Sequence, residues 1–326
     1  MTLPTARLGT TDMDITRVGF GAWAVGGSWA YGWGAQDDQE SIDAIRHAVE
    51  QGVNWIDTAA VYGLGHSEEV VARAVKGLSQ MPYIFTKCGM IWDDQGNVSR
   101  VARPATIRRE VEASLRRLDV EVFDLYQVHQ VPADGTPVEE YWQMMVDLKN
   151  EGMVRAIGLS NHSVALLERA DKIGHVDSLQ PPFSMIDRTQ ADEIAWCARN
   201  GTGVIVYSPM QSGLLTGAFS RERVEALPAD DWRRRVPDFT TELDQNLALA
   251  ESLRPIAERH GVTQAAVAVA WTLAWPGVTG AIVGARRPDQ VDGWLPAASL
   301  QLTQEDLDEI AVAIERTGAG RGPVRP

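Results

Sequence analysis

The sequence predicts an α/β protein built as a (β/α)8 barrel, in which parallel strands alternate with outer helices. The length of 326 residues suits this fold, because such barrels need about 250 residues and tolerate insertions. Short β-rich runs alternate with longer amphipathic stretches, the pattern of a parallel sheet with crossover helices. No low-complexity linker divides the chain, so we expect one domain over residues 1–326.

The expected strands are short runs of apolar, mostly β-branched or aromatic residues. Eight such runs occur, which is the number that closes a barrel of this type. In chain order they are Val18–Gly21, Val53–Asp57, Tyr83–Thr86, Phe123–Val128, Arg155–Leu159, Val176–Gln180, Gly203–Tyr207 and Gly280–Val283. A segment before the first run, Arg7–Thr16, is expected to form a β-hairpin that caps the bottom of the barrel, with its turn at Thr10–Asp12.

The expected helices begin and end at residues that commonly mark helix ends. Gly52 follows the first helix as a C-terminal glycine, and Pro104 stands in the first turn of another. The predicted helices are Asp38–Gln51, Ala105–Leu118, Pro137–Glu151 and Thr263–Trp275, with a further helix start at Ser67–Glu69. Leu243–His260 and Thr303–Arg316 exceed the simple repeat, and we expect them as extra helices toward the C-terminus.

Charge and composition argue against several partners. The net charge of −14 opposes binding to nucleic acid, which depends on clustered Lys and Arg. The one compact basic run, Arg233–Arg235, lies among aspartates and is expected to be a solvated loop. Cys88 and Cys197 are too far apart to suggest a disulfide framework or a metal site. No apolar run approaches a membrane span, so we expect a cytoplasmic protein without a membrane partner.

Polar side chains follow most of the predicted strands at their carboxyl ends. In a barrel of this type the active site is built at that edge, because the loops after the strands converge there. The residues concerned are Asp57, Lys87, His129, Ser160, Asn161, Gln180, Tyr207, Ser208, Gly284 and Arg286. One such coincidence would carry little weight, but the same register in seven strands predicts a functional site.

Four residues at this edge suggest proton transfer. A phenol has a pKa near 10, so Tyr62 needs a neighbouring ammonium to stabilise its anion, and a carboxylate can hold that ammonium in place. Lys87 and Asp57 come from neighbouring strands and can fill these roles, while His129 can hydrogen-bond a carbonyl oxygen. Taken singly, Asp57 would be read as a helix cap or a member of an ion pair. His129 would be read as a structural histidine, and Lys87 as a solvated residue at the rim of the barrel. Their combination favours a catalytic site.

Several segments resemble the signature motifs of the aldo-keto reductase superfamily. They are "GVNWIDTAAVYGLGHSEE", "FTK", "DLYQVHQ", "RAIGLSNHS", "LQPPFS", "VYSPMQSGLLTG" and "IVGARRPDQ", which occur in the order of that family. The likeness runs from about Leu8 to Arg316 and is greatest to bacterial general-stress-type oxidoreductases, relatives of the potassium channel β subunits. Each motif alone is modest, whereas the set is specific.

The resemblance implies a role for each matching residue. Tyr62 would be the general acid, Lys87 and Asp57 would tune it, and His129 would orient the carbonyl. A nicotinamide cofactor would then lie across the barrel mouth, which agrees with the absence of a Gly-x-Gly-x-x-Gly motif. The implied cofactor-binding residues are Ala22, Trp23, Asp57, Ser160, Asn161, Gln180, Tyr207, Ser208, Pro209, Met210, Gln211, Ser212, Gly213, Leu214, Gly284, Arg286, Arg287 and Gln290.

The adenosine end of the implied site favours NADPH. Arg286 and Arg287 match the segment that faces the 2′-phosphate in the family, and guanidinium groups suit a dianion. The match also has departures. Many relatives have Glu-Asn where this chain has Gly293 and Trp294, and channel-type relatives have Lys where it has Ala218. The adenine contacts are therefore expected to differ from the family pattern, and the change at Ala218 leaves the cofactor affinity and the closing of the loop open.

Aromatic residues in two glycine-rich loops predict a substrate pocket. Trp29 and Trp33 follow the first strand, and Trp92 follows the third. These residues do not recur at helical spacing, so we expect them to form an aromatic wall for an apolar or planar substrate. The alternative is that they anchor their loops. Cys88 alternates to the opposite side of its strand from Lys87 and is expected to pack in the core.

The sequence as a whole favours an NADPH-dependent oxidoreductase that reduces an aldehyde or a ketone to the alcohol. One alternative is an NADPH-binding regulatory or redox-sensing protein of low turnover, which the likeness to channel subunits permits. Another is a metal-dependent barrel hydrolase that uses Asp57 and His129, but the chain has no His-x-His or carboxylate cluster to support it. No metal is expected, and neither the substrate nor the oligomeric state can be read from the residues.

Overall fold

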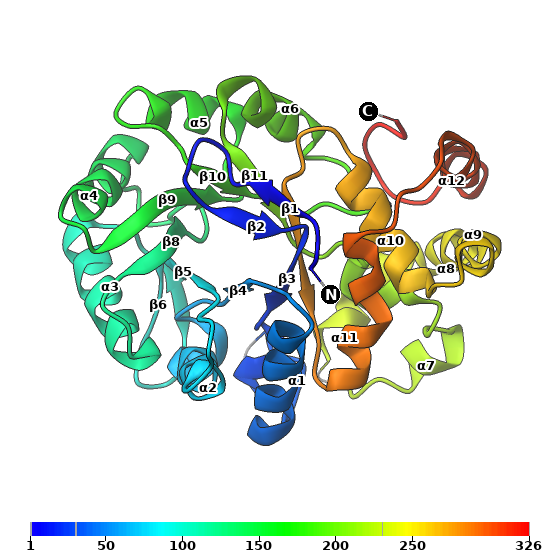
Figure 1. Cartoon of the computed structure of the whole chain (residues 1–326), viewed down its shortest axis with the longest axis horizontal. Helices are drawn as coiled ribbons and strands as arrows, with labels where there is room; N and C mark the ends of the chain where they lie inside the picture. The colour runs from blue at the N-terminus through cyan, green and yellow to red at the C-terminus, as the bar shows by residue number, and fades with distance from the viewer. Residues whose placement is uncertain (1, 30, 230, 326) are drawn as a thin grey trace.

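The computed structural model describes residues 2–29, 31–229 and 231–325, and it confirms the predicted barrel (Figure 1). Eight parallel strands close on themselves, because the last strand pairs with the first in a register that joins Gly284 to Gly21. In barrel order the strands are β3 (Val18–Gly21), β4 (Trp55–Asp57), β5 (Tyr83–Cys88), β8 (Phe123–Val128), β9 (Val154–Ser160), β10 (Ser178–Gln180), β11 (Gly203–Val206) and β12 (Gly280–Gly284). Each overlaps one of the predicted strands.

Helices surround the strands, and local signals place their ends. The Asp37 side chain accepts a hydrogen bond from Glu40 N and caps the first helix, and Pro104 stands in the first turn of α3. The helices that follow the barrel strands are α1 (Asp38–Glu50), α2 (His66–Val75), α3 (Pro104–Leu118), α4 (Val138–Asn150), α5 (Val164–Asp171), α6 (Ala191–Asn200), α10 (Gln264–Ala274) and α11 (Pro288–Trp294). Of these, α5, α6 and α11 were not predicted from the sequence.

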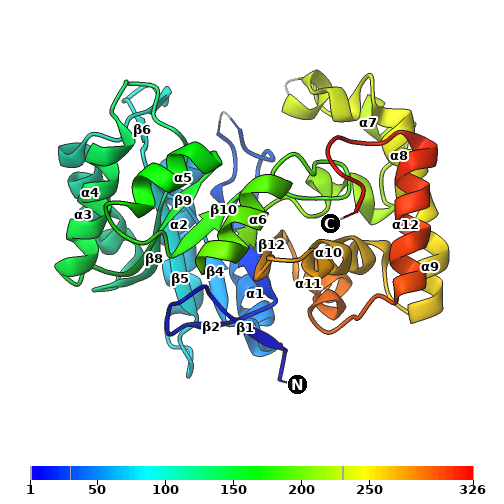
Figure 2. The ribbon, with the colours of Figure 1, turned by 90° about the horizontal axis from the view of Figure 1, so that it is seen from above.

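The additional helices gather on one side of the barrel, away from α3 and α4 (Figure 2). They are α7 (Arg221–Glu225), α8 (Leu243–Ser252), α9 (Arg254–His260) and α12 (Gln304–Thr317). The single helix predicted over Leu243–His260 is wrong. Pro255 has no N–H to donate and its ring disfavours a continuing helix, so the chain breaks at Leu253 into α8 and α9. None of the helices described is long and apolar enough to cross a membrane.

The predicted N-terminal hairpin caps the bottom of the barrel, as Figure 1 shows. It consists of β1 (Thr5–Arg7) and β2 (Asp14–Thr16), paired in antiparallel register. Its buried side chains Leu8, Met13 and Ile15 pack against inward-facing residues of the strands, Trp55 and Phe85 among them. The hairpin therefore closes the amino-terminal end of the strands, which leaves the carboxyl end for the functional site.

Two loops at the open end differ from expectation. The segment after β5 forms a second hairpin, β6 (Met90–Trp92) and β7 (Val98–Arg100), whose turn is held by backbone N–H groups donating to the Asp93 carboxylate. The basic run Arg233–Arg235 is not a fully solvated loop. Arg233 is 8% exposed, because its guanidinium pairs with Asp231 at 2.6 Å and stacks over the Trp33 ring at 4.5 Å.

The packing inside the barrel predicts a sharp difference between two glycine substitutions. A Cβ at Gly19 on β3 would lie 2.1 Å from Trp55 Cε2, and Trp55 is fully buried. Gly19→Ala should therefore destabilise the protein by about 1–3 kcal/mol through overpacking. The matched control is Gly293→Ala in α11, where a Cβ meets nothing within 4 Å and should stabilise the helix by roughly 0.5–1 kcal/mol. Urea unfolding midpoints measure both, and equal midpoints would contradict this account of the core.

Candidate active site

A buried ion pair lies at the centre of the carboxyl end of the barrel. Lys87 Nζ, on β5, lies 2.5 Å from Asp57 Oδ1 at the end of β4. Their side chains are 0% and 3% exposed. Lys87 also donates to the carbonyl oxygen of Thr58 at 2.8 Å. The adjacent parallel strands β4 and β5 bring the two residues together, so the predicted contact is present.

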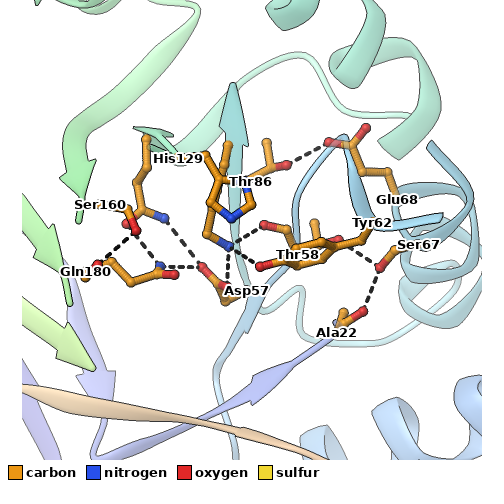
Figure 3. A network of polar contacts seen from close by, with 12 residues as sticks. Ala22, Asp57, Thr58, Tyr62, Ser67, Glu68, Thr86, His129, Ser160 and Gln180 are labelled. Carbon is orange, nitrogen blue, oxygen red and sulfur yellow. Dashed lines mark hydrogen bonds and ion pairs between the residues drawn. The ribbon is translucent and has the colours of Figure 1, made fainter. Parts of the chain in front are cut away.

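Tyr62 and His129 lie beside this pair (Figure 3). Tyr62 opens a short 3-10 turn after β4, and Lys87 Nζ donates to its hydroxyl oxygen at 3.3 Å. His129 follows β8, where its backbone N–H donates to the carbonyl oxygen of Cys88 at 2.9 Å. The rings of Tyr62 and His129 stand edge to face with centroids 5.6 Å apart. The structure thus brings all four predicted catalytic residues into one cluster.

The electrostatics of the cluster favour a protonated phenol and a neutral imidazole. Burial raises the pKa of Tyr62 well above its usual value, and the Asp57 carboxylate adds to this effect. Burial lowers the pKa of His129 well below its usual value, and the nearby Lys87 charge acts in the same direction. Burial also lowers the pKa of Lys87, against the opposing effect of Asp57. Both ring groups can therefore donate a hydrogen bond at neutral pH.

A second layer of polar residues, which the sequence did not reveal, holds this cluster in place. Ser67, at the start of α2, donates to the carbonyl oxygen of Ala22 at 2.9 Å and shares a hydrogen bond with Thr58. Thr86 donates to the buried Glu68 carboxylate at 2.6 Å, as Figure 3 shows. These bonds join the ends of β3, β4 and β5 to α2, so they fix the backbone that carries Asp57 and Lys87.

The second carboxylate oxygen of Asp57 contacts two glutamine amides. Gln180 Nε2, from β10, lies 2.8 Å from Asp57 Oδ2, and Gln127 Nε2, from β8, lies 3.4 Å away. Gln127 is fully buried, and no role was assigned to it from the sequence. One signal could have found it: a polar residue two positions before His129 in an apolar strand points to the same side of the sheet.

The side chains expected to hold a nicotinamide carboxamide are linked to one another. Ser160 donates to the carbonyl oxygen of Gln180 at 2.8 Å. Asn161, with a left-handed φ of 61°, donates to the carbonyl oxygen of His129 at 3.1 Å and accepts from the Tyr207 hydroxyl at 2.8 Å. The predicted residues therefore meet at the same edge of the barrel, with much of their hydrogen-bonding capacity used within the protein.

The loop after β11, residues 208–214, has an unusual backbone. Ser208, Gln211 and Ser212 have φ values of 57°, 45° and 52°, a region that non-glycine residues rarely adopt. Gln211 is held from both sides, because its Oε1 accepts from the Ser184 hydroxyl at 2.7 Å and its Nε2 donates to Asp238 at 2.6 Å. Strained backbone held by its surroundings is common at functional sites, which fits the predicted path of a pyrophosphate along this loop.

The two arginines after β12 differ in their partners. Arg286 bonds the Gln36 side chain and donates to the carbonyl oxygen of Ala35 at 2.6 Å, and its backbone N–H donates to Gln290 Oε1 at 2.7 Å. Arg287 is about half exposed and donates to the Asp289 carboxylate at 3.0 Å. Arg286 thus ties two loops together, whereas Arg287 reaches solvent.

The aromatic residues of the pocket loops contact the site at different places. Trp33 packs edge to face on Trp23 at 5.8 Å and lies 6.5 Å from Trp232 between ring centroids. The Trp29 ring lies 6.1 Å from that of Tyr62. Trp92, on β6, lies over the guanidinium of Arg117, which is bonded to Glu68 on the outer side of the barrel. Trp29 is therefore the nearest of these rings to the cluster.

The groups at this edge fit a nicotinamide dinucleotide. Among the described residues, Gln180 Oε1 has no hydrogen-bond partner and can accept from a carboxamide. The half-buried Tyr207 offers a ring face, and the half-exposed Arg287 offers a cation. Within residues 2–29, 31–229 and 231–325 no group of three or more His, Cys, Asp and Glu side chains is arranged to hold a metal ion.

The contribution of the buried Lys87–Asp57 pair to stability can be measured separately from its role in the reaction. Lys87→Met leaves Asp57 without its cation, which should destabilise the protein by about 3–5 kcal/mol. Adding Asp57→Asn removes the orphaned charge and should restore much of this loss, although the reaction rate should stay low. Urea unfolding of both variants and of Asp57→Asn alone measures the effect. If the double variant were no more stable than Lys87→Met, the idea that the two buried charges balance each other would be contradicted.

Comparisons with known proteins agree with this geometry. The family model described as "Aldo/keto reductase family" matches residues 17–315. The chain is 35% identical over 325 residues to a protein named NADH-specific methylglyoxal reductase of Escherichia coli (strain K12), with 95% of this chain and 98% of that protein covered. It is 34% identical over 312 residues to an aldo-keto reductase of Bacillus subtilis (strain 168), with 94% and 92% covered.

A solved structure is also similar. The glycerol dehydrogenase of Gluconobacter oxydans superposes with a TM-score of 0.89 at 35% identity, covering 99% of this chain and 98% of that one. The residues that the family model matches include every strand of the barrel and all four clustered residues. The resemblance seen in the motifs is therefore confirmed, and this chain belongs to the aldo/keto reductase family of oxidoreductases, which act on carbonyl compounds with nicotinamide cofactors.

Proposed function

We propose that this protein reduces an aldehyde or ketone to the alcohol with NADPH as the reductant. The observation that supports this most directly is the Tyr62 hydroxyl, 3.3 Å from Lys87 Nζ and next to the His129 ring. The Tyr62 hydroxyl, as proton donor, and the His129 ring, as a second hydrogen-bond donor, can both face the oxygen of one substrate carbonyl. This juxtaposition is suited to protonating an oxygen that gains negative charge during the reaction.

The proposed mechanism assigns one step to each residue. When bound, the reduced nicotinamide supplies the hydride that the carbonyl carbon accepts. Tyr62 donates its proton to the carbonyl oxygen, because its raised pKa keeps it protonated until the oxygen becomes basic. Lys87 stabilises the phenolate that remains, and Asp57 holds Lys87 in position. The neutral His129 donates a hydrogen bond that orients the carbonyl.

The preference for NADPH rests on the arginines after β12. Arg287 reaches solvent and has one carboxylate partner, Asp289, from which it can turn toward a 2′-phosphate. A guanidinium binds a phosphate through strong charge-assisted hydrogen bonds. One relative carries the name of an NADH-specific enzyme, so the two cofactors must be compared directly.

The substrate is proposed to be a small carbonyl compound that binds against the aromatic loops. Relatives are named for methylglyoxal and glycerol, both small oxygenated molecules. Trp29 lies against Tyr62, and Trp33 packs with Trp23 on the same side. We propose these rings as the pocket wall, with Trp92 at its rim on the β6–β7 hairpin.

Substitution of the proton donor tests the reaction. Tyr62→Phe retains the ring that packs on Trp29 but removes the hydroxyl, so reduction of 4-nitrobenzaldehyde should slow by about 10²–10⁴-fold. Binding of NADPH, followed by tryptophan fluorescence, should change less than twofold. A wild-type protein that binds NADPH but reduces no carbonyl in a broad panel would instead support the alternative of a redox-sensing protein with low turnover.

The adenosine site has its own test. Arg287→Ala should weaken NADPH binding by roughly 10- to 100-fold, the loss expected for a charged hydrogen bond, and leave NADH binding within twofold. Asp289→Asn should tighten NADPH binding, since it frees Arg287 from its carboxylate partner. Titration of both cofactors against each variant gives the answer. Equal losses for the two cofactors would show that Arg287 does not recognise the 2′-phosphate.

A further inference from the structure

The orientation of the Gln180 side-chain amide follows from its neighbours. Asp57 Oδ2 lies 2.8 Å from one end of this amide. A carboxylate only accepts hydrogen bonds, so the amide nitrogen must be the atom that faces it. The same Nε2 donates its second hydrogen to Gln127 Oε1 at 3.1 Å. Both N–H groups of Gln180 are therefore used inside the barrel.

This arrangement leaves Gln180 Oε1, which has no hydrogen-bond partner among the described residues, as an acceptor for a ligand at the mouth of the barrel. The neighbouring side chains offer less, because Ser160 Oγ already accepts from the Asn161 amide and Asn161 Oδ1 accepts from the Tyr207 hydroxyl. The nicotinamide carboxamide has an NH₂ group that needs an acceptor. Gln180 Oε1 can serve only while the amide is prevented from flipping.

Gln127 acts together with Asp57 against this flip, because a flipped amide would set Gln180 Oε1 against Gln127 Oε1 as well as against the carboxylate. It is fully buried on β8, and its own Nε2 lies 3.4 Å from Asp57 Oδ2, which leaves its Oε1 pointing to Gln180. The two glutamines belong to strands that are not adjacent, since β9 lies between them. Gly158 on β9 makes this reach possible, because a Cβ there would come within 3.0 Å of Gln127 Cγ.

We propose that Gln127 is a positioning residue that fixes the amide of Gln180, so that Oε1 accepts a hydrogen bond from the nicotinamide carboxamide. Through Asp57, the same side chain couples cofactor recognition to the Tyr62–Lys87 pair. This inference rests on the proposed function, because it needs a nicotinamide cofactor at the barrel mouth. It assigns Gln127 a role that a polar residue merely filling the core would not have.

Cofactor analogues can test this without any turnover. The 3-acetylpyridine analogue of NADP⁺ has a methyl ketone in place of the carboxamide and so lacks its N–H donors, whereas the thionicotinamide analogue keeps them. Dissociation constants come from quenching of tryptophan fluorescence. Wild type should bind NADP⁺ about five- to tenfold more tightly than the acetylpyridine analogue, the difference expected for one hydrogen bond. The thionicotinamide analogue should bind about as well as NADP⁺.

Gln127→Met retains the length of the side chain but removes the acceptor. It should lower the ratio of the two dissociation constants, mainly by weakening NADP⁺, because Asp57 then holds the Gln180 amide alone. Gln180→Met should do the same, and Gln143→Met on the exposed face of α4 is the control that should leave the ratio unchanged. Thermal unfolding of each variant reports its stability separately from this ratio.

The outcomes separate this inference from the proposed function. A wild-type ratio near one, a wild-type ratio retained in Gln127→Met, or an equal loss of affinity for all three cofactors would each overturn the role of Gln127. The last of these is the result expected for a purely structural residue. Failure of the protein to reduce carbonyls would overturn the proposed reaction, yet the change of ratio would still support the positioning role.

Discussion

The buried pair of Lys87 and Asp57 is the interaction on which the rest of the site depends. Two opposite charges with almost no solvent contact are costly unless every donor and acceptor is satisfied. Lys87 uses its three donors on Asp57, on the backbone of Thr58 and on Tyr62. Asp57 in turn receives Lys87 on one oxygen and Gln180, with Gln127 more distant, on the other. The Tyr62 hydroxyl, the proposed proton donor, is therefore part of the network that makes the buried charges tolerable.

Barrel closure supplies the geometry that this network needs. Parallel register sets Asp57 opposite Phe85 and Lys87 opposite Gln127, so inward-facing side chains of β4, β5 and β8 arrive at similar heights. The hairpin β1–β2 and the ring of Trp55 fill the lower interior with apolar side chains. Polar groups are thereby concentrated in the upper interior, where desolvation strengthens each hydrogen bond and makes each unpaired group expensive.

Outside the barrel, contacts between loops hold the segments that are proposed to bind the cofactor and the substrate. Arg286 joins the loop after β12 to Ala35 and Gln36, and Gln211 joins the loop after β11 to Ser184 and Asp238. Arg233 joins a third pair of loops, because its guanidinium stacks on the Trp33 ring. These contacts join segments far apart in the chain.

The sequence by itself determined the strands of the barrel, the capping hairpin and the four clustered residues, because each depends on local patterns: apolar runs, turn residues and a polar side chain at a strand end. The tertiary structure alone decided the features that depend on side chains from distant segments. Gln127 and Glu68 look like ordinary polar residues until β10 and β5 place an amide and a hydroxyl against them. Arg233 reads as solvated until Trp33 covers it. Such contacts carry no periodic signal, since they are set by the packing of elements that the chain order keeps apart.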